Sequence, residues 1–184
     1  MHTMIVMMGG QGVGKGTFSK MLMSIGDYTH IETGAILRAA PADSDIAKTI
    51  ARGELVTDEL LFDFIAPKID CGTDIILDGF PRTTPQAQWL VKNYANKFDI
   101  QIIYLNVPES VMTARIEKRI REGGGRADDA DTAAVRRRLD TFWKITVPAI
   151  EWLRTAPGIK FADISVAAPD AETNFAKIRA AIGK

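Results

Sequence analysis

The sequence has little of the chemistry on which many binding proteins and enzymes depend. Among its 184 residues there is one cysteine, Cys71, and there are only two histidines. A single cysteine excludes an internal disulfide and a cysteine-built zinc site, and it fits a reducing compartment. The formal net charge is zero, so no global positive field attracts nucleic acid and any anion must be bound by local clusters.

Long apolar segments are also missing. No apolar run approaches the roughly 20 residues that a helix needs to cross a bilayer. Residues 1–4 lead directly into an apolar stretch, without the cationic region and cleavage site of a signal peptide. We therefore expect a cytoplasmic protein that binds neither membrane nor nucleic acid.

The patterns that are present predict an α/β fold in one domain. Short apolar runs alternate with longer helical patterns, which is typical of a parallel sheet. We expect strands near residues 4–8, 28–31, 74–77, 100–107 and 159–164. Apolar residues at helical spacing predict helices over 87–94, 135–153 and 171–182, the second of them kinked by Pro148.

A glycine-rich segment, GGQGVGKGT, follows the first expected strand at residues 9–17. Glycines allow backbone amides to turn inward, and the helix that follows offers its positive end to phosphate. Lys15 adds a compact positive charge. Gly16 stands where serine or threonine usually binds magnesium, so we expect Mg²⁺ to be held by phosphates and water, with Thr17 and a carboxylate nearby.

A second segment, DGFPRTTPQ at residues 78–86, follows a later strand. Asp78 falls at the carboxyl end of that strand, where open parallel sheets bind ligands. It can orient magnesium-bound water there, although an aspartate in this position can also cap a turn. Arg82 lies on a turn constrained by Gly79 and Pro81, and its guanidinium suits a phosphate.

The third basic feature is a stretch of seven arginines between residues 115 and 138. A run of charges is usually a solvated helix face. Five acidic residues in the same stretch favour that interpretation for Arg121, Arg136 and Arg137. Three consecutive glycines at 123–125 predict a flexible loop or hinge within it.

Taken in order, the segments 9–17, 32–38, 53–58 and 78–86 resemble those of adenylate kinases, as do the arginines and the segment 125–129 that follow them. The resemblance covers essentially the whole chain. It implies a P-loop kinase fold, with a five-stranded parallel sheet flanked by helices. It further implies a single domain over 1–184, with an NMP-binding insertion at 33–65, a short lid at 121–131 and a monomeric state.

The resemblance also implies the site residues. ATP would be bound by Gly12, Val13, Gly14, Lys15, Gly16, Thr17, Arg119 and Arg115, the last stacked on the adenine. AMP would be bound by Thr33, Gly34, Arg38, Val56, Gly79, Arg82, Gln86, Arg126 and Arg138. The catalytic residues would be Lys15, Arg82, Arg119, Arg126 and Arg138, because phosphoryl transfer depends mainly on positioning and charge neutralisation. Thr17 and Asp78 would act on Mg²⁺ through water.

Two residues favour AMP as the acceptor. Adenylate kinases carry threonine and glutamine where this chain has Thr33 and Gln86, whereas the related pyrimidine kinases tend to have alanine and asparagine. The predicted reaction is Mg²⁺-dependent transfer from ATP to AMP, giving two ADP. One alternative is a kinase for UMP, CMP or another monophosphate. The other is a nucleotide-binding regulatory protein with low turnover, which is suggested by Gly16 and by Ala35 in place of an aspartate.

Overall fold

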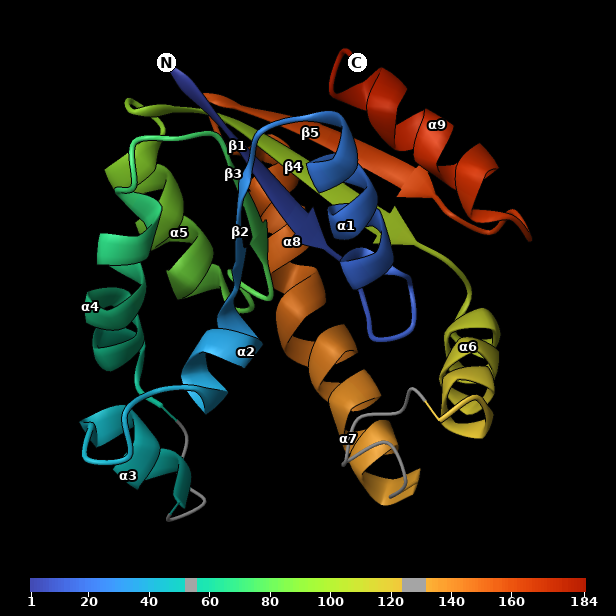
Figure 1. Cartoon of the computed structure of the whole chain (residues 1–184), viewed down its shortest axis with the longest axis horizontal. Coiled ribbons are helices and arrows are strands. Elements are labelled where there is room, and N and C mark those ends of the chain that lie inside the picture. The colour runs from blue at the N-terminus through green and yellow to red at the C-terminus, as the bar shows by residue number, and fades with distance from the viewer. Residues whose placement is uncertain (52–55, 124–131) are drawn as a thin grey trace.

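A twisted parallel sheet forms the centre of the computed structural model, which describes residues 1–51, 56–123 and 132–184 (Figure 1). The strands lie in the order β2-β3-β1-β4-β5 and are all parallel. Their bounds are His2–Met8 (β1), Thr29–Glu32 (β2), Ile75–Asp78 (β3), Phe98–Asn106 (β4) and Ile159–Ser165 (β5). The predicted five-stranded sheet is confirmed, with strand ends shifted by one or two residues.

The central strand β1 explains why its sequence is apolar at every position. It pairs with β3 on one side and β4 on the other, so both its edges and both its faces are covered. Successive side chains point to opposite faces of a strand. Met4, Val6 and Met8 accordingly join one hydrophobic cluster, and Ile5 and Met7 join the other.

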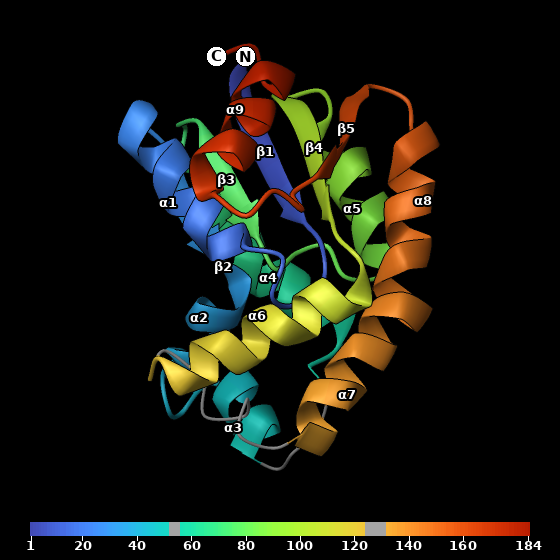
Figure 2. The same cartoon turned by 90° about the vertical axis from the view of Figure 1, so that its right-hand side faces the viewer.

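Helices cover both faces of the sheet (Figures 1 and 2). One face packs against α4 (Asp58–Ile69), α5 (Thr84–Tyr94) and α8 (Val147–Thr155). The other packs against α1 (Lys15–Ile25), α6 (Glu109–Arg121) and α9 (Ala171–Ala181). Within the described ranges, no helix is both long enough and apolar enough to span a membrane.

The long helix expected over 135–153 is interrupted. It consists of α7 (Thr132–Thr141), a π-helical turn η2 (Phe142–Thr146) and α8. Val147 N–H donates to Phe142 O, five residues back, at the end of the π-helical turn. Pro148 has no N–H and would crowd the carbonyl four residues earlier, so an α-helical ladder cannot continue through this point. The irregularity therefore lies just before the proline, as a widened turn.

Two groups of helices extend beyond the carboxyl ends of the strands (Figure 1). The predicted insertion at 33–65 contains α2 (Thr33–Arg38), α3 (Asp45–Ala51) and the start of α4. On the other side are the end of α6 and the start of α7. Most of the predicted lid at 121–131, like most of the glycine loop at 123–125, lies outside the described residues. The division into domain, insertion and lid therefore stays a prediction.

Candidate active site

The segment that follows β1 turns through glycines before α1 begins. Gly12 and Gly14 have φ angles of 82° and 104°, in the left-handed region that favours glycine. A Cβ on Gly12 would lie 2.6 Å from Met112 O, so the loop also packs closely against α6. Gly14 precedes α1 and has no side chain with which to cap it, which suits the first amides of this helix to an anion. The backbone thus has the form that phosphate binding requires.

Lys15 is the first residue of α1, and its side chain folds back over the loop. Nζ donates to Gly9 O at 2.7 Å and to Gly10 O at 3.1 Å. These bonds hold the ammonium against the loop backbone. Apart from its chain neighbours and the backbone of its own helix, no atom of the described residues lies within 4 Å of where a Cβ on Gly16 would stand, and Thr17 beside it is exposed. There is consequently open space next to Lys15 at the start of the helix.

Asp78 lies at the same edge of the sheet as the loop. It is the last residue of β3 and is only 6% exposed. The strand register places it opposite Met7 of β1 on one side and Glu32 of β2 on the other. The carboxyl ends of three neighbouring strands therefore bring the loop, Asp78 and the start of α2 together.

Three of the residues assigned to the acceptor, Thr33, Gly34 and Arg82, lie around Gly79. A Cβ on this glycine would lie 3.4 Å from Arg82 Nη2 and 3.8 Å from both Gly34 N and Thr33 Cβ. Gly79 has a φ of 85°, which permits the turn that follows β3. Arg82 Nε donates to Gly79 O at 2.8 Å, so the guanidinium is tied to the turn on which it stands. Residues from two distant segments thus form one cluster beside Asp78.

Thr33 contributes a buried hydroxyl to this cluster. The residue is 5% exposed, and its Oγ1 has no hydrogen-bond partner among the described residues. Burying a polar group without a partner costs about 1–3 kcal/mol, so such groups call for an explanation. A ligand that bonds to Oγ1 would supply one.

Gln86 lies in the first turn of α5 and is 7% exposed. Its Oε1 accepts from Arg82 N–H at 2.8 Å, and its Nε2 donates to Asp58 Oδ1 at 2.7 Å. Val56, just before α4, is half-buried against the core. Arg38 is the last residue of α2, and its side chain lies outside the described part of the chain. Arg126 as a whole lies outside the described residues.

The arginines on α6 and α7 divide as their sequence context suggests. Arg121, Arg136 and Arg137 are exposed, whereas Arg119 and Arg138 are half-buried. The glycine-rich loop at 9–17 contacts both helices. Gln11 Nε2 donates to Val135 O at 2.9 Å, and a Cβ on Gly10 would lie 2.5 Å from Met112 Sδ. Arg119 and Arg138 thus belong to helices that flank the loop.

Arg115 is anchored by two backbone carbonyls. Its Nη1 donates to Val13 O at 3.2 Å, and its Nη2 donates to Val166 O at 2.7 Å. The first carbonyl belongs to the loop, and the second follows β5. The guanidinium therefore joins the loop to the segment that precedes α9.

Similarity to known proteins decides the family. The chain matches the family model described as "Adenylate kinase" over residues 7–157. A protein named adenylate kinase from Parvibaculum lavamentivorans is 38% identical over 177 residues, which cover 86% of each chain. Another from Bacteroides thetaiotaomicron is 37% identical over 160 residues, 82% of this chain and 84% of its own. A third, from Beijerinckia indica, is 35% identical over 187 residues, 90% of this chain and 96% of its own.

The chain belongs to the adenylate kinase family. Membership confirms the predicted fold and the predicted class of enzyme, a nucleotide-binding phosphotransferase that uses ATP. It does not favour the alternatives of a pyrimidine monophosphate kinase or a regulatory protein. The roles of individual residues remain predictions.

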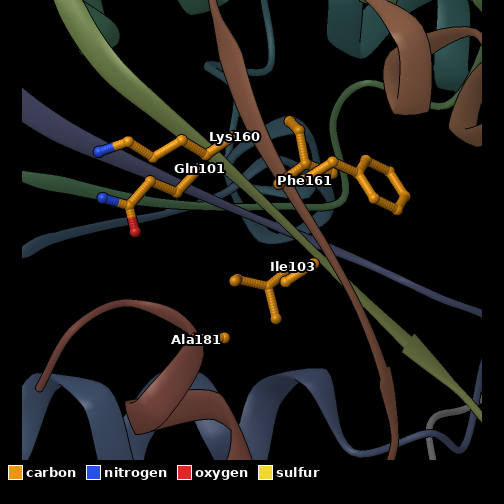
Figure 3. Close-up of a pocket in the computed structure, with 7 residues that line it drawn as sticks. Gln101, Ile103, Lys160, Phe161 and Ala181 are labelled. Atoms are coloured by element: carbon orange, nitrogen blue, oxygen red, sulfur yellow. The ribbon is translucent and has the colours of Figure 1, made fainter.

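Two hollows among the described residues are lined by none of the residues that are predicted to bind nucleotide. Figure 3 shows the smaller, of about 40 Å³, where Gln101 and Lys160 extend side by side from β4 and β5 and Ala181 of α9 lies nearby. A hollow of this size holds no more than a few water molecules. The larger, of about 220 Å³, opens between α3 and α4 and is lined by Ser44, Asp45, Ile46, Leu60, Asp63 and Phe64. Neither includes a residue of the phosphate loop or of the cluster around Gly79.

Three residues that hold parts of the candidate site in place received no role from the sequence. Asp58 binds the amide of Gln86, and Gln11 ties the loop to α7. Asn174 holds the segment after β5 through three hydrogen bonds to backbone atoms. Asp58 belongs to a segment that resembles the family, which was the only available signal. Contacts between residues 28 and 124 positions apart leave no trace in local sequence patterns.

Proposed function

We propose that this protein transfers a phosphoryl group from ATP to AMP, reversibly, and that the two nucleotides bind at the carboxyl edge of the sheet. The observation that carries the proposal is that two separate groups of residues, each suited to an anion, lie beside one buried carboxylate. One is the loop at 9–17 with Lys15, and the other is the cluster around Gly79 with Arg82. Between them, at the end of β3, is Asp78.

ATP is the expected occupant of the loop. Backbone amides of residues 12–17 would bind its phosphates together with the ammonium of Lys15. Lys15 now bonds to two loop carbonyls, and phosphate oxygens would be stronger acceptors in their place. Arg115 already lies against the loop through Val13 O, which supports the expected contact with the adenine of ATP.

AMP is the expected occupant of the second arrangement. Arg82 and Arg38 would bind its phosphate, and the buried Oγ1 of Thr33 would gain a hydrogen-bond partner. Gln86 would read the edge of the base. Gly34, Val56 and Gly79 would contact the nucleotide mainly through their backbone or apolar surface.

The residues at this edge suit magnesium, which does not need a full set of protein ligands. Among the described residues, no three side chains of the metal-binding types are grouped together. Mg²⁺ commonly keeps several waters and binds one or two carboxylates plus substrate phosphates. Asp78, with Thr17 on α1, would hold its water shell. When bound, the ion would neutralise phosphate charge.

Phosphoryl transfer requires mainly that the two nucleotides are aligned and that positive charge lies near the transferring group. Arg119, Arg126 and Arg138 would converge on the transferring group, where one arginine can contribute about 10³–10⁵ in rate. Closure of the insertion at 33–65 and the lid at 121–131 would exclude water and so prevent hydrolysis of ATP. We further expect a monomer in the cytoplasm, consistent with a single cysteine.

A coupled assay with ATP, Mg²⁺ and a panel of monophosphates tests this proposal. We expect ADP formation that depends on AMP and exceeds the rates with UMP, CMP and GMP. Equal or higher rates with UMP or CMP would overturn the assignment of AMP. Binding of ATP without transfer to any monophosphate would overturn the proposed activity itself.

A further inference from the structure

The amide of Gln86 is held at both of its ends by groups of fixed polarity. The backbone N–H of Arg82 can only donate, and it bonds to Oε1 at 2.8 Å. The carboxylate of Asp58, when ionised, can only accept, and it bonds to Nε2 at 2.7 Å. The hydrogen-bond network therefore admits one orientation of this amide and opposes the flipped one.

The partner that sets the Nε2 end comes from a different part of the fold. Asp58 is the first residue of α4, directly after Thr57, whose side chain accepts from Leu60 N–H and caps the helix. Gln86 stands in the first turn of α5, where Thr83 is the cap. One hydrogen bond thus connects the predicted NMP-binding insertion with the segment that contains Arg82.

Among the described residues, one donor and one acceptor of the amide have no partner and are available to a ligand. Nε2 has two N–H groups and Oε1 has two lone pairs, and the contacts above use one of each. Adenine presents an acceptor at N1 beside a donor at its 6-amino group, and cytosine presents the same pair at N3 and its 4-amino group. Uracil and guanine present the opposite pair, an N–H beside a carbonyl oxygen.

We infer that Asp58 is a specificity-determining residue, which acts by positioning the amide of Gln86 for a base with an amino group. This inference rests on the proposed binding of the acceptor base by Gln86. A free glutamine could read either kind of edge by rotating its amide through a half turn. If the amide were rotated, Oε1 of Gln86 would face the carboxylate of Asp58, and Nε2 would face the N–H of Arg82. Both contacts would be repulsive. Bases of the uracil and guanine type are therefore rejected.

The inference is tested by the variant Asp58→Asn in the full-length enzyme. Asparagine has the same size but can either donate or accept, so it no longer enforces one orientation. We expect the ratio of kcat/KM for AMP over UMP to fall by about tenfold or more, as loss of a discriminating hydrogen bond typically gives. The AMP over CMP ratio should stay within roughly twofold, because both bases present the same pair. KM for ATP should not change.

Two further variants distinguish the positioning of Gln86 from a general effect of removing a negative charge from α4. Glu59→Gln removes the same charge from the same turn of α4, at an exposed residue, and should leave the AMP over UMP ratio unchanged. In a Gln86→Leu background, Asp58→Asn should no longer alter that ratio, because the coupling between the two residues is lost. If Asp58→Asn does not fold, as judged by circular dichroism, Asp58→Ser serves in its place.

The outcomes distinguish this inference from the proposed function. A wild-type enzyme with no AMP-dependent turnover would overturn both. An active wild type whose selectivity is unchanged by Asp58→Asn would overturn only the role of Asp58. So would an equal effect of Glu59→Gln, or an effect that persists without Gln86.

Discussion

At the scale of single residues, the cations of the candidate site are tied to backbone carbonyls. Lys15 bonds to two carbonyls of its own loop, Arg82 to Gly79 O, and Arg115 to Val13 O and Val166 O. A long cationic side chain loses rotamer entropy when it is fixed. These contacts hold Lys15, Arg82 and Arg115 near their expected positions. Part of the entropy loss therefore occurs on folding and not on substrate binding, which favours catalysis by alignment.

Lys15→Met tests the role of the lysine directly. Methionine keeps an unbranched stem but has no charge, so we expect kcat/KM to fall by about 10³-fold or more, in the range typical of a charge that stabilises phosphoryl transfer. Circular dichroism and urea unfolding should report an intact fold. Lys20→Met is the matched control, since Lys20 is exposed on the same helix. Similar losses in the two variants would contradict a specific role for Lys15.

At the scale of elements, a buried polar side chain holds the loop that follows β5. Asn174 on α9 is 2% exposed and bonds to the N–H and O of Ala168 and to Asp170 O. The loop it holds begins with Val166, whose carbonyl accepts from Arg115. The position of α9 is thereby linked to the expected adenine side of the ATP site.

Asn174→Ala should destabilise the protein by about 2–3 kcal/mol, at roughly 1 kcal/mol for each hydrogen bond lost. Urea unfolding monitored by fluorescence measures this change. Asn93→Ala is the control, because Asn93 is exposed and its one side-chain hydrogen bond to a described residue is to Trp89 O, within its own helix. It should cost less than about 0.5 kcal/mol, as most surface substitutions do. Equal losses would show that Asn174 does not fix the loop.

The elements also show what sequence patterns can and cannot predict. The β1 strand was predictable because five consecutive buried positions, 4–8, leave a run with no polar residue. The π-helical turn at Phe142–Thr146 was not, because the apolar spacing of a long helix continues through it. The cluster at Gly79 was predictable from the order in which the adenylate kinase-like segments occur along the sequence. The bond from Gln86 to Asp58 depends on how α4 packs beside α5, which only the tertiary structure reveals.

At the scale of the whole molecule, stability depends on pH through buried groups away from the site. Tyr94 of α5 is 2% exposed and packs its ring near those of Trp89 and Phe98. Burial, with the nearby charge of Asp70 and a hydrogen bond to it, raises the pKa of Tyr94 to about 12. Since this folded-state pKa lies above that of an unfolded tyrosine, the stabilisation is complete below about pH 10 and is lost as the pH rises toward 12.

The free energy of unfolding should therefore fall by roughly 2 kcal/mol more between pH 8 and pH 11.5 in the wild type than in Tyr94→Phe. Urea titrations at pH 8, 10 and 11.5 measure the difference. A decline of the same steepness in both proteins would contradict the assigned burial of the tyrosine hydroxyl.

The central claim is that two nucleotides bind together across the carboxyl edge of one sheet. The reaction of ADP alone with Mg²⁺ tests this most directly, because transfer between two ADP molecules requires both sites at once. ³¹P NMR should show ADP converted into equal amounts of ATP and AMP, without inorganic phosphate. Unchanged ADP, or phosphate released in place of ATP, would contradict the account.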